Sequence, residues 1–133
     1  MKTGTINQII HFSTDPETVY FMIMNPEKHA AFTGSKVEMS EEIGGNFNVF
    51  DGYCHGTNIA LEKGKKILQH WHFAEEGWPE DHYSICTFEF ESCETGTKLT
   101  FTQTDIPEHN VSQLENGWKE YYWEAMTDFI KYQ

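Results

Sequence analysis

The last quarter of the chain, from Ile106 to Tyr132, has the hydrophobic spacing of one long helix. Apolar residues recur there at steps of three and four, whereas charged residues such as Glu115 and Glu124 lie largely off that line. A helix of about 23 residues spans roughly 35 Å, which is the width of a small domain. The pattern therefore predicts a helix that crosses the domain and buries one apolar stripe, made of Val111, Leu114, Trp118, Tyr121, Ala125 and Phe129.

The N-terminal part of the chain predicts one strand and two short helices. Thr5 to Phe12 alternates loosely between apolar and polar residues, as a strand does. The sequence STDP at positions 13–16 combines capping side chains with a proline suited to a first helical turn, so a helix is expected up to about Met24. Asn25-Pro26 should end that helix, and a second one is expected from Glu27 to Phe32.

Between Lys36 and Thr104 the hydrophobic period changes to two, which indicates strands. Turn residues such as Gly44-Gly45 and Lys63-Gly64-Lys65 separate six such runs. The predicted order is therefore a strand, two short helices, six antiparallel strands and a long helix. We expect a single α+β domain over residues 1–133, in which a curved sheet and the long helix cover each other's apolar face.

Composition adds one feature to this picture, an unusually aromatic core. The chain has 20 Phe, Trp and Tyr residues against 18 Ile, Val and Leu residues. Flat rings fill an interior less completely than aliphatic side chains do. A cavity lined by aromatic rings is therefore one expectation, and a fully packed aromatic core is the other.

The net charge of −12 argues against nucleic acid or an anionic membrane as a partner, because the field of the protein repels phosphates. The N-terminus lacks the apolar run of a signal peptide, and no later segment is long enough to span a bilayer. Cys54, Cys86 and Cys93 form no CxxC pair, so free thiols in a reducing cytoplasm are expected.

Several short motifs occur in the order and spacing of a known family. They are GGNFNV at Gly44–Val49, Gly56, the segment Lys65–Trp71, GTKLTFTQTDIP at Gly96–Pro107, and ENGW at Glu115–Trp118. Together they resemble proteins similar to the C-terminal domain of the activator of heat-shock-protein-90 ATPase, in the START/Bet-v-1-like (SRPBCC) superfamily. The resemblance implies a helix-grip fold, with a curved antiparallel sheet wrapped around a long C-terminal helix.

No residue pattern points to catalysis. The chain contains no GxSxG, HExxH or P-loop motif. Cys86 could face a cavity, but a thiol near Phe88 and Phe90 should be poorly ionised. His70 and His72 share a strand face opposite Trp71, so they should point outward and bind no zinc tightly. We therefore expect neither an enzyme, nor a metal site, nor a cofactor.

Gly117 is unusual because glycine inside a helix costs about 1 kcal/mol relative to alanine. Two explanations are open. The helix backbone could approach the sheet closely at this point, in which case Gly117→Leu should destabilise the fold by overpacking. Alternatively, the missing side chain could leave space beside Trp118 for a ligand. Close packing is the primary expectation.

The leading functional hypothesis is a domain that binds a hydrophobic or aromatic small molecule between the helix and the sheet, where the resembling superfamily holds its ligands. The expected cavity measures some hundreds of Å³. One alternative is a co-chaperone-like protein-interaction module, which binds a protein partner or a second copy of the chain. Another is a cyclase- or hydrolase-like enzyme on the same fold. The candidate ligand-binding residues are Phe47, Tyr53, Trp71, Phe88, Phe90, Phe101, Gln103, Leu114, Trp118 and Tyr121.

Overall fold

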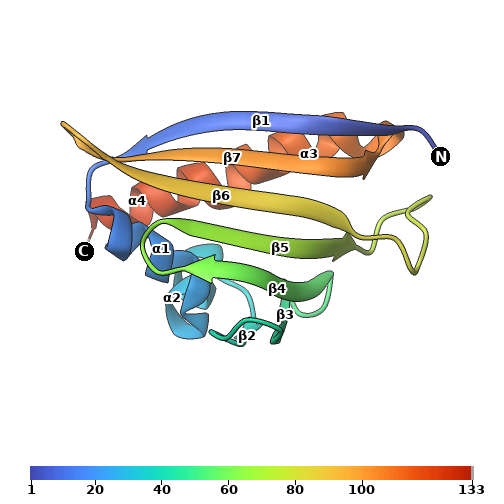
Figure 1. Cartoon of the computed structure of the whole chain (residues 1–133), viewed down its shortest axis with the longest axis horizontal. Coiled ribbons are helices and arrows are strands. Elements are labelled where there is room, and N and C mark those ends of the chain that lie inside the picture. The colour runs from blue at the N-terminus through green and yellow to red at the C-terminus, as the bar shows by residue number, and fades with distance from the viewer. Residues whose placement is uncertain (133) are drawn as a thin grey trace.

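The computed structural model describes residues 1–132, in which seven antiparallel strands form one curved sheet (Figure 1). The strands follow the order β1-β7-β6-β5-β4-β3-β2, so β1 and β2 form its two edges. Strand β1 pairs with β7 from Thr3↔Pro107 to Phe12↔Thr97. The strands are β1 (Thr3–Phe12), β2 (Glu38–Met39), β3 (Asn46–Val49), β4 (Cys54–Glu62), β5 (Lys66–Phe73), β6 (Ser84–Cys93) and β7 (Gly96–Pro107).

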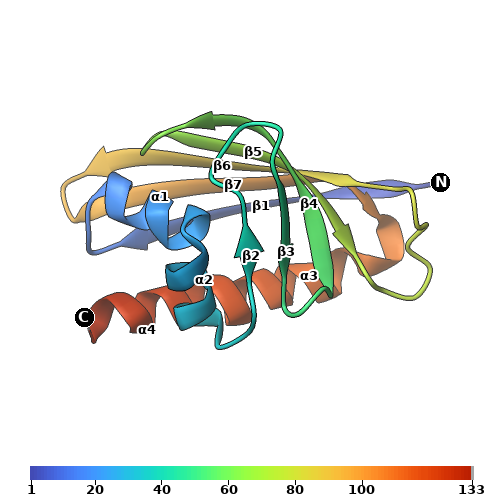
Figure 2. The same ribbon diagram turned by 90° about the horizontal axis from the view of Figure 1, so that it is seen from below.

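The C-terminal helical segment lies across one face of this sheet, and two short N-terminal helices lie on the same side near its C-terminal end (Figure 2). This arrangement confirms the helix-grip fold and the predicted order of elements. The helices are α1 (Pro16–Met24), α2 (Pro26–Thr33), the 3₁₀ turn η1 (Glu108–Asn110), α3 (Val111–Trp118), the π-helical segment η2 (Lys119–Glu124) and α4 (Ala125–Lys131).

The boundary between α1 and α2 forms where the sequence predicts it. Asn25 follows the last residue of α1, and its side-chain oxygen accepts a hydrogen bond from the Lys28 N–H at 3.0 Å. Pro26 then occupies the first position of α2, where a proline costs no hydrogen bond. Gly34 ends α2 with a φ of +72°, a left-handed conformation that glycine adopts without strain.

The predicted apolar stripe of the long helix is wrong at Tyr121, whereas Ala125 and Phe129 are half-buried and pack against the core. Leu114 and Trp118 are buried as expected, but Tyr121 is 54% exposed, and its neighbours Tyr122 and Trp123 are buried instead. The cause is η2, because a π-helical turn closes hydrogen bonds from residue i to i+5 and holds more residues than an α-turn. The residues after Trp118 are therefore rotated, and Met126 rather than Ala125 is fully buried beyond η2.

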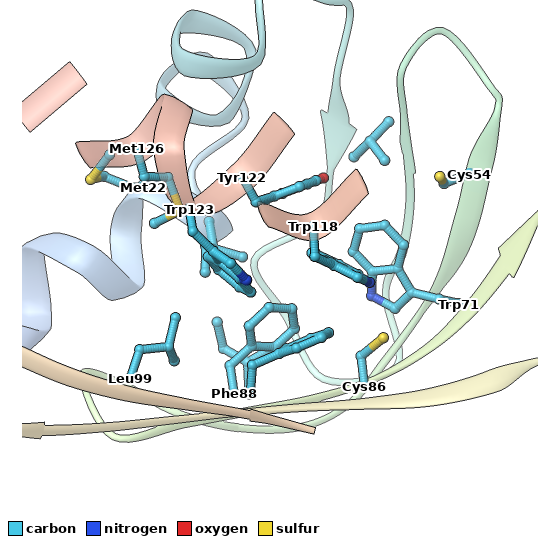
Figure 3. Packing of buried hydrophobic residues seen from close by; sticks show 14 of the residues in the cluster. Met22, Cys54, Trp71, Cys86, Phe88, Leu99, Trp118, Tyr122, Trp123 and Met126 are labelled. Atoms are coloured by element: carbon cyan, nitrogen blue, oxygen red, sulfur yellow. The ribbon is translucent and has the colours of Figure 1, made fainter. Parts of the chain in front are cut away.

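The core lies between the concave face of the sheet and the helices. Its largest fully buried side chains include Trp71, Phe88 and Phe101, which stand on adjacent or nearby strands of the sheet. Trp118, Tyr122 and Trp123 extend from the helix towards Trp71 and Phe88 (Figure 3), and Trp118 and Trp123 also pack on Phe101. Within residues 1–132, no helix has both the length and the apolar character needed to cross a membrane.

Candidate functional site: an aromatic pocket beneath the C-terminal helix

A pocket of about 120 Å³ lies between α3, the start of η2, and the strands β4 and β5. Seven of its eleven lining residues are aromatic. It reaches the surface beside Gln113 and Tyr121, which are both exposed. The lining residues are Phe50, Tyr53, Cys54, Trp71, Phe73, Gln113, Leu114, Gly117, Trp118, Tyr121 and Tyr122.

The two tryptophans of the pocket are held by buried glutamines on the strands. The Trp71 indole N–H donates to Gln69 Oε1 at 2.8 Å, and the Trp118 indole N–H donates to Gln103 Oε1 at 2.7 Å. The ring centroids of Trp71 and Trp118 lie 5.1 Å apart and meet at 62°. Because the hydrogen bonds satisfy the indole N–H groups, the rings offer their apolar surface to the pocket.

Gly117 lines this pocket, and a Cβ atom built there would have no atom within 4 Å apart from its two chain neighbours and the nearby helix backbone. The expected close approach between helix and sheet is therefore wrong at this residue. The geometry fits the other explanation, in which the missing side chain leaves open space beside Trp118. Overpacking gives no reason for Gly117→Leu to destabilise the fold, contrary to the prediction from sequence.

The Glu75 carboxylate lies next to the pocket, where it contacts two of the lining residues. Glu75, in the loop after β5, accepts hydrogen bonds from the Tyr53 hydroxyl and from the Gln113 amide, the latter at 3.0 Å. The backbone tethers the same loop, because the Ala74 N–H donates to the Tyr53 carbonyl at 2.9 Å. Glu75 thus links the loop before β4 to α3 across the pocket opening.

The predicted binding residues divide into two groups. Tyr53, Trp71, Leu114, Trp118 and Tyr121 line the pocket. The other five belong to the packed core around it, and the Gln103 amide is occupied at both ends, by Trp118 and by the Ser84 hydroxyl at 2.9 Å. The core group consists of Phe47, Phe88, Phe90, Phe101 and Gln103.

Sequence reasoning missed Phe50, Cys54, Phe73, Gln113 and Tyr122, which also line the pocket. Phe73 was detectable, because it shares a strand face with Trp71. Phe50 and Gln113 carry no periodic signal, since one lies in a turn and the other on a polar helix face. Tyr122 faces the pocket only because the π-helical segment η2 rotates the residues that follow Trp118.

The pocket offers no activated nucleophile. Burial raises the pKa of the Cys54 thiol well above its ordinary value, and burial does the same for Cys86, which lies in the core behind the pocket. Burial also raises the pKa of the Tyr53 phenol, and its hydrogen bond to Glu75 adds to the rise. These groups stay protonated at neutral pH, so they act as hydrogen-bond partners or apolar surface rather than as nucleophiles.

His70 and His72 lie on the outer face of the sheet, opposite the inward-pointing Trp71. His72 is covered by the loop after β5, and its Nδ1 lies 3.1 Å from the His82 carbonyl oxygen. The His55 ring lies 4.8 Å from the His72 ring, and burial, with a smaller contribution from His72, lowers the His55 pKa. Among residues 1–132, no three His, Cys, Asp or Glu side chains are placed to hold a metal ion.

A family model described as "Activator of Hsp90 ATPase homolog 1-like protein" matches residues 13–131. The chain belongs to this family. Among curated relatives, the human "Activator of 90 kDa heat shock protein ATPase homolog 1" is 30% identical over 121 residues, covering 91% of this chain and 35% of the human protein. A homologue from Dictyostelium discoideum is 31% identical over 118 residues, covering 88% of this chain and 30% of that protein. This chain therefore spans about a third of the length of the Hsp90-activator relatives that it matches.

Solved structures agree with the family assignment. An Hsp90 activator from Plasmodium falciparum superposes with a TM-score of 0.85 at 25% identity, covering 97% of this chain and 96% of that one. Protein MLL2253 from Mesorhizobium loti superposes with a TM-score of 0.81 at 20% identity, covering 99% and 98% of the two chains, and shows a shared fold. Membership of the activator-like family supports a binding domain in general terms, for a ligand or for a protein partner.

Proposed function

We propose that this chain is a binding domain whose pocket beneath α3 takes one small hydrophobic or aromatic group of a ligand. The observation that carries the proposal is the open space at Gly117, surrounded by aromatic rings. A helix that needed only to pack on the sheet would gain stability from alanine at this position. A glycine at this position is explained if an occupant fills the space that a side chain would take.

The size of the pocket limits the ligand. An apolar cavity of about 150 Å³ holds one benzene molecule, so the 120 Å³ found here suits one ring or a group of similar volume. The expected cavity of some hundreds of Å³ is therefore too large, because Trp118 packs directly on Phe101, with 4.4 Å between ring centroids. A long fatty acid would not fit within this volume, whereas a single-ring compound would.

A single-ring ligand should quench or shift the fluorescence of Trp71 and Trp118 and raise the melting temperature as its concentration increases. In Gly117→Leu, the added side chain should fill the pocket and abolish both responses while the protein stays folded. Asn116→Leu is the matched control, because residue 116 is exposed on the same helix and does not line the pocket. Equal binding by wild type and Gly117→Leu would refute the pocket as the binding site.

The family relatives favour a second function, the binding of an Hsp90-type ATPase. Two curated relatives at 30% and 31% identity bear the name of activators of that ATPase. If this chain shares the activity, adding it to purified Hsp90 should raise the rate of ATP hydrolysis several-fold and in a saturable way. Heat-unfolded chain at the same concentration is the control, and an unchanged rate together with no measurable binding would exclude this function.

A further inference from the structure

We propose that the pocket prefers a positively charged alkylammonium group, such as a quaternary amine, over a neutral or anionic group of the same size. This inference rests on the proposed function, because it names the ligand class of the same pocket. It follows from three properties of the site: the arrangement of its rings, the absence of cationic lining residues, and the carboxylate next to it.

Several ring pairs of the pocket meet at steep angles, whereas Trp71 and Phe73 stack at 26°. Phe50 meets Tyr121 at 71° and Tyr122 at 77°, while Tyr53 meets Phe73 at 80°. Because rings at such angles do not lie in one plane, we infer that some of them turn a face towards the enclosed space. The face of an aromatic ring carries negative electrostatic potential, and several faces around one space attract a cation that lies within about 6 Å of their centroids.

The charged groups near the pocket also favour a positively charged ligand. Among residues 1–132, the side chains that line the pocket include no Lys, Arg or His. The Glu75 carboxylate adjoins the opening through its hydrogen bonds with Tyr53 and Gln113. By accepting the Tyr53 hydrogen, it also increases the electron density of that ring. These charges favour a cation in the pocket, and no lining residue offers a positive charge that would compete with it.

The volume of the pocket and the net charge of the protein also support a preference for an alkylammonium group. A trimethylammonium group is comparable in volume to a benzene ring, so it fits the 120 Å³ available. The net charge of −12 also raises the local concentration of cations and lowers that of anions around the whole protein. A carboxylate ligand would meet Glu75 at the entrance without a cation to pair with, so fatty or aromatic acids should bind poorly.

The test compares two ligands that differ only in charge. Choline and 3,3-dimethyl-1-butanol have nearly the same shape, but the first carries a quaternary nitrogen where the second has a carbon. With ionic strength matched by NaCl, titration calorimetry and tryptophan fluorescence should show choline binding about tenfold more tightly or better. Equal or tighter binding of the neutral alcohol overturns the inference and leaves the proposed function standing. If choline, the alcohol and single-ring aromatics all fail to bind, both the inference and the proposed function are wrong.

Variants then test the carboxylate. Glu75→Gln keeps an oxygen that can accept from Tyr53 but removes the charge, so the preference for choline should fall about fivefold or more. Glu80→Gln is the matched control, because Glu80 is an exposed residue of the same loop and makes the same change in net charge. If Glu80→Gln lowers the preference as much as Glu75→Gln, the specific role of Glu75 is wrong.

An alkylammonium group can belong to a free small molecule or to a methylated lysine side chain. A trimethyllysine peptide and its unmethylated counterpart therefore form a third arm of the experiment. Binding of choline at least as tight as that of the trimethyllysine peptide supports a small-molecule ligand. Much tighter binding of the methylated peptide supports the same chemistry with a protein as its source.

Discussion

Replacing Trp118 with alanine is expected to lower the free energy of unfolding by about 3–5 kcal/mol, because it removes a large side chain from a packed site. Trp118 is buried, and its ring lies 4.4 Å from the Phe101 ring and 4.6 Å from the Tyr122 ring. The substitution also leaves the buried Gln103 oxygen without its donor, which adds to the loss. Denaturant unfolding at neutral pH measures the change.

Two further variants keep this prediction testable if Trp118→Ala does not fold. Trp118→Phe keeps an aromatic ring at the site but removes part of the indole and the hydrogen bond to Gln103, so a loss of about 1–3 kcal/mol is expected. Tyr121→Ala should cost no more than about 1 kcal/mol, because half of that side chain faces solvent. If Tyr121→Ala lowers stability as much as Trp118→Ala does, the conclusion that η2 turns Tyr121 towards solvent is wrong.

Acidification is expected to destabilise the protein through His29. His29 is fully buried, and its Nδ1 donates to the Ile23 carbonyl at 2.8 Å, so Nε2 is free to accept from the Tyr122 hydroxyl at 2.8 Å. Burial lowers the His29 pKa to about 4. A lowered pKa means that the unfolded chain binds the proton first. Stability is therefore complete above about pH 6.5 and is lost as the pH falls towards 4, by about 3 kcal/mol in total.

The free energy of unfolding at several pH values between 7 and 4 tests this expectation. His29→Gln cannot titrate, so its stability should depend less on pH over this range, even if the variant is less stable at pH 7. His11→Gln is the matched control, because His11 is exposed, and it should keep the wild-type slope. Parallel curves for wild type and His29→Gln would rule out His29 as the source of the acid sensitivity.

Most of the architecture could be predicted because it depends on local patterns. Asn25-Pro26 ends one helix and starts the next through backbone chemistry that is independent of the rest of the fold. Alternation places Trp71 inward and His70 outward whatever the neighbouring strands are. The order of a strand, two helices, six strands and a helix therefore follows from residue periods and turn residues, and the motifs at Gly44–Val49 and Glu115–Trp118 add the family.

The candidate site was predicted less completely, because its residues meet through contacts between distant segments. Glu75 is one of many acidic residues in the sequence, and nothing in its loop distinguishes it. It becomes notable only when the fold brings Tyr53 and Gln113 to its two oxygens. Phe88 and Phe101 have the expected inward direction, but Trp118 covers them, so they belong to the core rather than to the pocket.

The sequence by itself determined which faces of the strands and helices are apolar, because side-chain periodicity is a property of each element alone. It also determined the negative charge and the aromatic content from which a cavity was expected. Only the tertiary structure decided the phase of the long helix after Trp118, since the hydrogen bonding of η2 depends on how Tyr122 and Trp123 pack on the sheet. It likewise decided that the space beside Gly117 stays open, because the gap is bounded by β4 and β5, which are distant from that residue in sequence.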